Sequence, residues 1–127
     1  MEIKVGEYVR TYDGDIFRIT GKQRYKDLII YTTNTFCKYT EIVMNEIVKI
    51  HSKKQKDLIC EGDVVLCSIN NSKPQIEQII IWEEIQQDKP MLGTRAGIML
   101  DELTILKILT KEQFLQNCWN MEVWLNE

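Results

Sequence analysis

The sequence predicts a mainly β protein that contains two tandem copies of one small module. The first observation is a repeat, because residues 3–9 (IKVGEYV) recur as residues 59–65 (ICEGDVV), 56 positions later. The same offset of 56 positions aligns residues 41–47 with residues 97–103, and the aligned residues are chemically similar. The second observation is a series of short strand-forming runs separated by turn residues. We therefore expect each module to open with a G-[ED]-x-V strand start and to close with a strand of apolar-Asn/Asp-Glu-apolar pattern.

A β-hairpin is predicted near the start of the first module. Residues 8–12 and 16–20 flank Asp13-Gly14, a dipeptide that accepts the positive φ angles of a two-residue hairpin turn. We expect Gly21 to end the pair of strands, because glycine disfavours strand interiors.

Three further strands are expected in the first module. Residues 22–27 are polar and predict an exposed loop, after which residues 28–32 are rich in strand-forming residues. Asn34 is expected to turn the chain, so that residues 36–39 return as a short strand and residues 47–50 close the sheet. Five strands in this order predict a small β-barrel of SH3-like type.

The second module is expected to form a second barrel of the same SH3-like type. It opens with a strand at residues 63–69, turns through residues 70–74 and continues as a long strand at residues 75–85. This strand is apolar on both faces, so we expect both faces to be buried. The cover is the first module, the C-terminal helix or a second subunit. Its apolar residues are Ile76, Ile80 and Trp82 on one face and Ile79, Ile81 and Ile85 on the other.

The second half of this module is expected to be less regular. Residues 86–90 predict a turn, residues 91–97 predict a loop or distorted strand, and residues 103–109 predict the closing strand. The glycines of residues 91–97 do not predict a phosphate-binding loop, because the chain returns to a strand instead of beginning a helix.

A short C-terminal helix follows. Thr110 and Gln113 form the Thr-x-x-Gln pattern of a capping box, which starts the helix at Lys111. Apolar residues then recur at helical spacing, and two tryptophans lie off that stripe. The tryptophans either widen the buried face or contact a partner, and burial is the favoured interpretation. The stripe consists of Phe114, Cys118, Met121 and Leu125, and the tryptophans are Trp119 and Trp124.

The chain is accordingly divided into four segments. A linker is placed at residues 51–57 because this stretch has no apolar residue. Modules of this size bury too little surface to be comfortably stable alone, so we expect the two to pack together. The segments are a first SH3-like module at residues 1–50, the linker at residues 51–57, a second SH3-like module at residues 58–109, and the helix and tail at residues 110–127.

Composition limits the classes of function. The net charge is −3, but residues 1–60 carry 11 Lys/Arg against 8 Asp/Glu, whereas residues 61–127 carry 5 against 11. No run approaches the roughly 18 apolar residues of a membrane span, and the N-terminus lacks a secretory pattern, so a soluble cytoplasmic protein is expected.

The possible metal ligands do not favour a metal site, because the chain has one histidine, His51, and no C-x-x-C pair among its cysteines. We expect no metal or other cofactor. His51 itself is expected to be solvated.

Several stretches carry a resemblance to a known family. They are residues 3–10 (IKVGEYVR) with Asp13-Gly14, residues 47–49 running into His51-Ser52, Asp57-Leu58-Ile59 before Gly62-Asp63, and residues 108–114 (ILTKEQF). The combination resembles small proteins carried by phages and prophages of Gram-positive bacteria and their relatives. The likeness spans most of the chain, but an extra Ile separates Lys49 from His51, and residues 74–97 follow no pattern of the family. The resemblance brings no catalytic residues and implies a protein that acts by binding in the host cytoplasm, where some small phage proteins inhibit defence nucleases.

An enzyme is not expected. The chain has no G-x-S-x-G motif, no cysteine beside a plausible base and no paired carboxylates in a recognisable setting. Glu83 and Glu84 are neighbours in a strand and therefore point to opposite faces, so they cannot act together as acid and base.

Two kinds of binding remain. The favoured function is binding of a host protein, such as a defence nuclease with a basic channel, through acidic residues of the second module. These residues are Glu77, Glu83, Glu84, Asp88, Asp101 and Glu102. The alternative is nucleic-acid binding by the first module, with basic residues on phosphates and tyrosines stacked on bases. The residues for this alternative are Arg10, Arg18, Lys22, Arg24, Tyr25 and Lys26, with Tyr8 and Tyr12 as further stacking candidates. A structural or assembly role is a third alternative, and the apolar strand also allows a homodimer.

Overall fold

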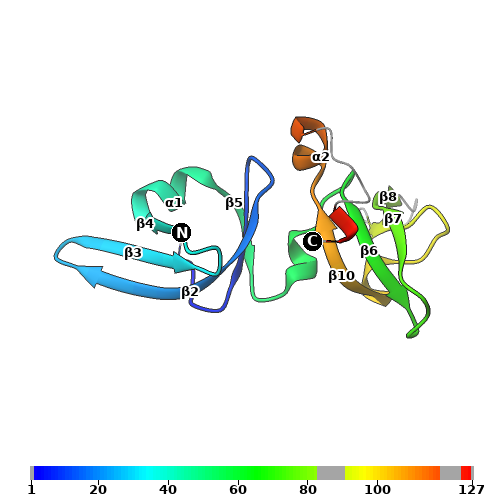
Figure 1. Cartoon of the computed structure of the whole chain (residues 1–127), viewed down its shortest axis with the longest axis horizontal. Helices are drawn as coiled ribbons and strands as arrows, with labels where there is room; N and C mark the ends of the chain where they lie inside the picture. The colour runs from blue at the N-terminus through cyan, green and yellow to red at the C-terminus, as the bar shows by residue number, and fades with distance from the viewer. Residues whose placement is uncertain (1, 83–90, 118–123, 127) are drawn as a thin grey trace. The chain divides into compact units, whose positions relative to one another are not determined.

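The computed structural model describes residues 2–82, 91–117 and 124–126 and is mainly β with a short C-terminal helix (Figure 1). The chain divides into two compact units, Met1–Leu58 and Ile59–Glu127, here called unit 1 and unit 2. Unit 1 contains β1 (Tyr8–Thr11), β2 (Ile16–Tyr25), β3 (Leu28–Thr33), β4 (Lys38–Thr40), α1 (Glu41–Ile47), β5 (Val48–Ser52) and the 3₁₀ helix η1 (Gln55–Leu58). The residues expected to form a linker are thus occupied by the end of β5 and by η1.

The strands of unit 1 form one antiparallel sheet in the order β4-β3-β2-β1-β5. Alternate side chains of β1 and β2 point to one face and are buried, and Met44 of α1 packs against them. Removing this apolar surface from water is the main stabilising contribution to the unit. The core consists of Ile3, Val9, Phe17, Ile19, Tyr31, Met44 and Val48.

The β1–β2 hairpin is confirmed, with a different turn. Thr11 N and Gly14 N close the connection by donating to Asp15 O at 2.9 Å and to Thr11 O at 3.0 Å. Only Gly14 of the Asp13-Gly14 pair has a positive φ, at +90°. This is the pattern of a longer turn followed by a left-handed glycine, instead of a two-residue turn with two left-handed residues.

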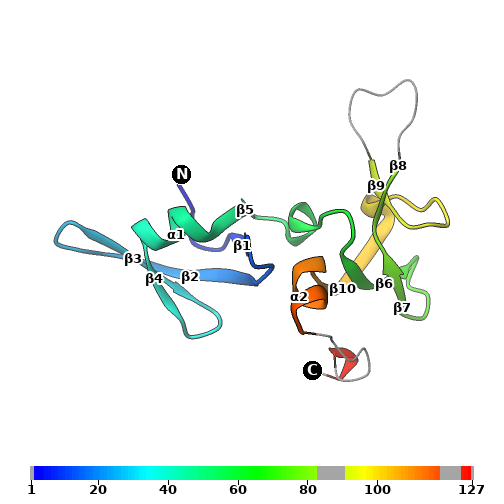
Figure 2. The same cartoon turned by 90° about the horizontal axis from the view of Figure 1, so that it is seen from above.

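The expected end of β2 at Gly21 and the expected loop at residues 22–27 are wrong. β2 continues to Tyr25 and pairs with β3, from Tyr25 opposite Leu28 back to Ile19 opposite Thr33, so that the two strands form a long hairpin (Figure 2). The register shifts between Ile19 and Gly21, which is a β-bulge. A Cβ at Gly21 would lie 2.4 Å from Oγ1 of Thr32, so the glycine is there for close packing and not to end a strand.

The closing strand of unit 1 also differs from the prediction. The apolar-Asn-Glu-apolar pattern of residues 44–47 was expected to be part of a strand, but it lies in α1, and β5 begins at Val48. The cause is an N-cap: Oγ1 of Thr40 accepts a hydrogen bond from Val43 N at 3.3 Å, and Glu41 lies in the first turn, where the helix dipole favours negative charge.

Unit 2 repeats the strand order of unit 1 in a more broken form. Its elements are β6 (Val64–Ile69), β7 (Gln75–Gln78), β8 (Ile80–Trp82), β9 (Met91–Gly93), the 3₁₀ helix η2 (Leu100–Glu102), β10 (Leu103–Leu109) and α2 (Lys111–Asn117). β6 pairs with both β7 and β10, as β1 pairs with both β2 and β5. β9 takes the place of β3. It pairs with β8 and, through Gly93, forms an isolated bridge with Met99, whereas β3 pairs with β2 and β4.

The two units also share their opening turn, as the repeat predicted. Gly6 and Gly62 have φ angles of +95° and +90°. Gly6 N donates to Ile19 O and Gly62 N donates to Ile79 O, both at 2.8 Å. Because only glycine adopts this backbone conformation readily, the G-[ED] pair at the repeated position has a direct structural cause.

The long apolar strand expected at residues 75–85 is interrupted. Its described part is split into β7 and β8 at Ile79, which is fully buried and exchanges backbone hydrogen bonds with the opening turn. The expectation of burial on both faces is wrong for Ile76 and Trp82, which are 41% and 37% exposed. Residue 85, Glu83, Glu84 and the turn expected at residues 86–90 lie outside the described residues.

Open sheets replace the expected barrels. The described strands form sheets of five, three and two strands, and none of these closes. In unit 1 the described edge strands are β4 and β5; β4 has only three residues, and α1 separates it from β5. In unit 2 the break at Ile79 divides the sheet. The last strand and the C-terminal helix agree with the predictions: β10 spans Leu103–Leu109, and α2 begins at Lys111.

Candidate functional site

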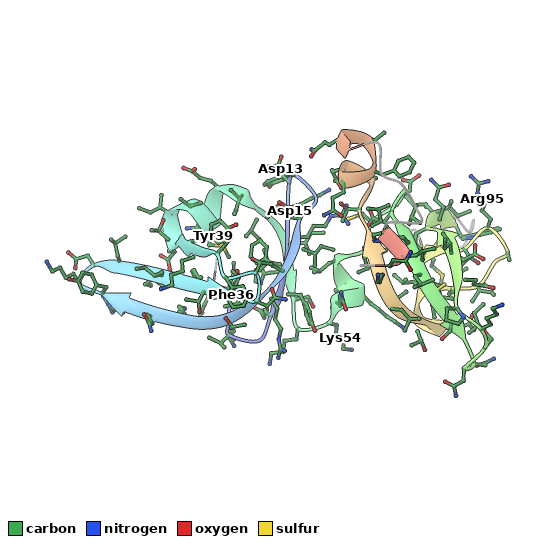
Figure 3. The ribbon with its side chains drawn as sticks, in the orientation of Figure 1. Asp13, Asp15, Phe36, Tyr39, Lys54 and Arg95 are labelled. Carbon is green, nitrogen blue, oxygen red and sulfur yellow. The ribbon has the colours of Figure 1, made fainter. Side chains whose placement is uncertain are left out.

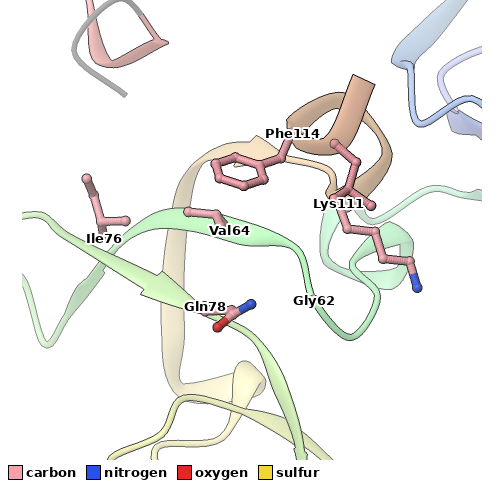
Figure 4. A pocket seen from close by; sticks show the side chains of 7 residues that line it. Gly62, Val64, Ile76, Gln78, Lys111 and Phe114 are labelled. Atoms are coloured by element: carbon pink, nitrogen blue, oxygen red, sulfur yellow. The ribbon is translucent and has the colours of Figure 1, made fainter. Parts of the chain in front are cut away.

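An apolar groove lies in unit 2 between α2 and the sheet of β6 and β7 (Figure 4). Its volume is about 500 Å³, within the range of roughly 300–1,000 Å³ typical of ligand sites. Figure 4 shows Phe114 of α2 facing the sheet side of the groove, where Val64 and Ile76 lie. The lining residues are Gly62, Val64, Ile76, Gln78, Lys111, Phe114 and Leu115.

The sheet side of the groove follows from strand register. Val64 is opposite Gln78 and Leu66 is opposite Ile76, so these four side chains share one face of the β6–β7 pair. The alternate residue Val65 points to the other face and is fully buried in the core of unit 2. The core therefore takes one face of these strands and leaves the groove on the other.

Asp63 holds the helix side of the groove in place. This fully buried carboxylate accepts a hydrogen bond from Cys60 N at 2.8 Å and another from Lys111 N at 3.0 Å. One side chain thus closes the opening turn and fixes the first residue of α2. A Cβ at Gly62 would lie 3.3 Å from Cδ of Lys111, so the turn and the helix are in close contact.

The predicted capping box supports this placement of α2. Oγ1 of Thr110 accepts from Gln113 N, and Oε1 of Gln113 accepts from Thr110 N, both at 3.3 Å. These reciprocal bonds satisfy two backbone donors at the start of the helix. The helix therefore begins at a defined residue and presents Phe114 and Leu115 at a defined position.

The groove has the chemistry of a binding surface. Ile76, Phe114 and Leu115 are 41%, 44% and 76% exposed, which is unusual for large apolar side chains gathered in one place. The polar side chains of the lining are those of Gln78 and Lys111, and Oε1 of Gln78 accepts a hydrogen bond from Arg95 at 3.0 Å. Among the described residues, this lining brings together no nucleophile, general base or carboxylate pair, and it suits apolar groups of a partner.

The sequence-predicted acidic residues are only partly described, and those do not line this groove. Glu77 lies on β7 opposite Val65, so it shares the face away from the groove. Asp101 and Glu102 lie in η2, where Oε2 of Glu102 accepts from Met99 N at 3.3 Å and caps the 3₁₀ turn. Asp101 borders a separate depression with Met91, Leu92, Met99 and Leu100. Glu83, Glu84 and Asp88 lie outside the described residues.

The sequence-predicted basic residues of unit 1 are not brought together. Arg10 is fully buried and donates from its guanidinium to Leu58 O at 2.9 Å, so it holds η1 and is not on the surface. Lys22 is opposite Tyr31 and Arg24 is opposite Ile29, which places both on the core side of the sheet.

The remaining predicted residues are dispersed over the other face and the hairpin tip. The Arg18 guanidinium carbon lies 5.9 Å from the centre of the Tyr8 ring. Tyr25 is exposed near the tip of the β2–β3 hairpin, where Lys26 Nζ lies 5.7 Å from the centre of its ring. Because of the bulge at Thr20, the side chains after it point to the face opposite to the one that simple alternation along β2 would give them.

His51 is not merely solvated. Its Nδ1 lies 3.3 Å from both carboxylate oxygens of Glu7. Oε2 of Glu7 also accepts a hydrogen bond from Lys4 N, at 2.6 Å. Burial raises the pKa of Glu7, but the hydrogen bonds from Lys4 and His51 outweigh it and leave that pKa below its ordinary value. Glu7 therefore has the same structural role in unit 1 as Asp63 in unit 2, which is to close the opening turn and bind a later segment.

The described cysteines are free thiols in different surroundings. Cys37 is exposed, Cys60 is half-buried and Cys67 is buried in the core of unit 2. Burial, and then the charge of Glu77, raises the pKa of the Cys67 thiol and makes it less reactive. Within residues 2–82, 91–117 and 124–126, no three His, Cys, Asp or Glu side chains are grouped so as to hold a metal ion.

Sequence reasoning missed the groove because its residues come from three separate segments. Phe114 was expected in the buried stripe of the C-terminal helix, but it borders the groove and is partly exposed. Trp124 is buried, as the favoured interpretation predicted, whereas Cys118, Trp119 and Met121 lie outside the described residues. The one local signal for the site was the apolar Phe114-Leu115 pair after the capping box.

The comparisons add no relatives: no family model, no curated protein and no solved structure matches this chain. In the described part of the chain, no helix is long and apolar enough to cross a membrane.

Proposed function

We propose that this protein is a non-catalytic phage or prophage protein that binds a host protein in the cytoplasm of the host cell. The favoured partner is a bacterial defence nuclease, which gives the protein an anti-CRISPR or similar anti-defence role. The observation that carries the proposal is the exposed apolar groove of unit 2, because contiguous exposed apolar surface marks sites of protein association. The resemblance of the sequence to small phage proteins supports the setting.

The charge of unit 2 favours a basic partner. Residues 61–127 carry 11 Asp/Glu against 5 Lys/Arg. An acidic surface speeds association with a basic one, such as the nucleic-acid channel of a nuclease, and suppresses binding to acidic proteins. In this proposal the groove supplies affinity through apolar contacts, and the acidic residues supply steering and specificity.

We also propose that the two units are diverged copies of one SH3-like module that remains open in both. The support is the common strand order, with a first strand that pairs with both the second and the last, and the common opening turn at Gly6 and Gly62. A helical segment precedes the last strand in each copy, α1 in one and η2 in the other.

Quantitative capture from host lysate tests the proposed function. Leu115 and Leu106 are both exposed leucines of unit 2, at 76% and 50%, but only Leu115 lines the groove. We expect Leu115→Glu to reduce capture of the specific partner by more than about tenfold, because a buried unpaired charge opposes binding. Leu106→Glu, with the same change of charge, is expected to capture it normally. Equal capture by both variants would show that the groove is not the contact.

A further inference from the structure

Unit 1 carries a second surface, on the face of its sheet that points away from the core. Tyr8 is paired with Arg18, and Thr32 is paired with Lys38. Their neighbours along the strands, such as Val9 and Tyr31, are buried in the core, so these four side chains lie on the opposite face. We call Tyr8, Arg18, Thr32 and Lys38 the outer face.

The strands that build the outer face have one sign of charge. β1 to β4 together contain five Lys or Arg residues and no Asp or Glu. Of these, Arg18 and Lys38 are exposed on the outer face. The Arg18 guanidinium lies 5.9 Å from the centre of the Tyr8 ring, a cation–π contact that holds both groups in a defined orientation. The outer face therefore offers positive charge beside an aromatic ring.

A hydrogen-bonded loop adds a second aromatic residue at the end of this face. Asn34 N donates to Arg18 O at 3.1 Å, and Oδ1 of Asn34 accepts from Arg18 N at 2.9 Å, so the loop after β3 is tied to β2 at Arg18. At the start of the loop, the last residue of β3 donates from Thr33 N and from Thr33 Oγ1 to Cys37 O, at 3.1 and 3.0 Å. The loop presents Phe36, labelled in Figure 3.

Phe36 is placed in a way that does not serve folding stability. Its side chain is 97% exposed, so it buries almost no apolar surface. Its φ angle is +66°, a left-handed conformation that is unfavourable for a bulky side chain. Strained and exposed residues that the surrounding hydrogen bonds hold in place are typical of contact sites. The arrangement presents a flat aromatic ring to solvent from the loop that is bonded to the backbone of Arg18.

We propose that the outer face and Phe36 bind single-stranded nucleic acid. Phe36 stacks on one unpaired base, and Arg18 and Lys38 contact phosphates on either side of it. A single strand fits because its bases are free to stack on an exposed ring, whereas the bases of a duplex already stack on each other. The absence of carboxylates from β1 to β4 favours a polyanion over a protein of mixed charge. The proposal concerns unit 1 alone and does not depend on the groove of unit 2.

Fluorescence anisotropy with the full-length protein tests the proposal. The probes are fluorescein-labelled oligo(dT) and oligo(rU) of about 12 nucleotides, which compare DNA with RNA, and a duplex of the same length. At about 50 mM salt we expect saturable binding of a single strand with a dissociation constant on the order of 10 μM. Two phosphate contacts predict a log–log salt dependence with a slope of about −1.4. No binding of either single strand, or tighter binding of the duplex, would overturn the proposal.

Phe36→Asn separates binding from folding. Asparagine tolerates the left-handed conformation better than phenylalanine, so the unfolding midpoint should stay the same or rise. Loss of the stacked base should weaken binding by roughly 5- to 150-fold. The control is Ile42→Ala, which removes a 66% exposed apolar side chain of α1 and should leave binding unchanged. Unchanged oligonucleotide binding by Phe36→Asn would contradict the role given to Phe36.

Two double variants, each of which removes two positive charges, test whether binding depends on the outer face. Arg18→Gln with Lys38→Gln removes the outer-face cations, and Lys22→Gln with Arg24→Gln removes two exposed cations on the opposite face. We expect the first pair to weaken binding strongly and to flatten the salt dependence, and the second pair to have little effect. Equal losses would mean non-specific attraction. A different result would assign this face to a protein: the wild type binds no oligonucleotide, and Phe36→Asn fails to capture a host protein that the wild type captures.

Discussion

Replacing Asp63 by alanine should destabilise unit 2 and release the start of α2. The buried carboxylate is the acceptor for two backbone donors, Cys60 N at 2.8 Å and Lys111 N at 3.0 Å. A buried donor that loses its acceptor costs about 1–3 kcal/mol. The carboxylate is fully buried, but Cys60 and Lys111 are not, so water can partly replace the lost acceptor and we expect a total loss of roughly 2–4 kcal/mol in the free energy of unfolding. Asp63→Asn keeps one carbonyl oxygen and should lose about half of this.

Tryptophan fluorescence during urea denaturation measures this loss in unit 2 selectively. The three tryptophans of the chain, Trp82, Trp119 and Trp124, all belong to unit 2. The matched control is Glu61→Ala, which removes an exposed carboxylate two residues away and should change stability by less than about 0.5 kcal/mol. If Asp63→Ala were as stable as Glu61→Ala, Asp63 would not hold the turn and the helix together, and the account of how the groove is positioned would fail.

Three further predictions concern unit 1 and the core of unit 2. The pKa of Glu7 is lowered from 4.5, so its carboxylate stabilises the protein above that pH, and this stabilisation is lost as the pH falls through the lowered value. The difference in stability between the wild type and Glu7→Gln should therefore shrink between about pH 6 and pH 3. A difference that stays constant in denaturation experiments over this range would contradict the prediction. Cys67 should resist iodoacetamide in the native protein and react only in denaturant, as peptide mapping by mass spectrometry would show, and native labelling as fast as that of Cys37 would refute its burial. Gly21→Ala places a methyl group against Oγ1 of Thr32 and should cost about 1–3 kcal/mol in thermal or urea unfolding, which Thr32→Ala in the same chain should largely restore; an additive loss would argue against the clash.

The elements that the sequence predicted well are those with a local cause. The opening turns follow from a glycine that must adopt a positive φ, and the same spacing marks both copies. The capping box of Thr110 and Gln113 is a contact within four residues, so its pattern survives in any tertiary setting.

The elements that were mispredicted depend on contacts between distant residues. Gly21 was expected to end a strand, but it accommodates Thr32 of the neighbouring strand, which no local pattern reveals. The helix α1 depends on Thr40 as N-cap, a signal that competed with the strand-like spacing of the residues after it. Lys22 and Arg24 were expected in a loop, because neither the bulge after Ile19 nor the pairing with β3 can be located from hydrophobic spacing alone.

Site-specific photo-crosslinking in the bacterial host tests the central claim most directly. A benzophenone amino acid at position 115 lies in the groove, and the same amino acid at position 106 lies on an exposed site of unit 2 outside it. We expect a discrete adduct with one host protein from position 115 and none from position 106, with the adduct lost when Ile76 is replaced by glutamate in the groove. No adduct from position 115, or equal adducts from both positions, would contradict the claim that the groove binds a host protein.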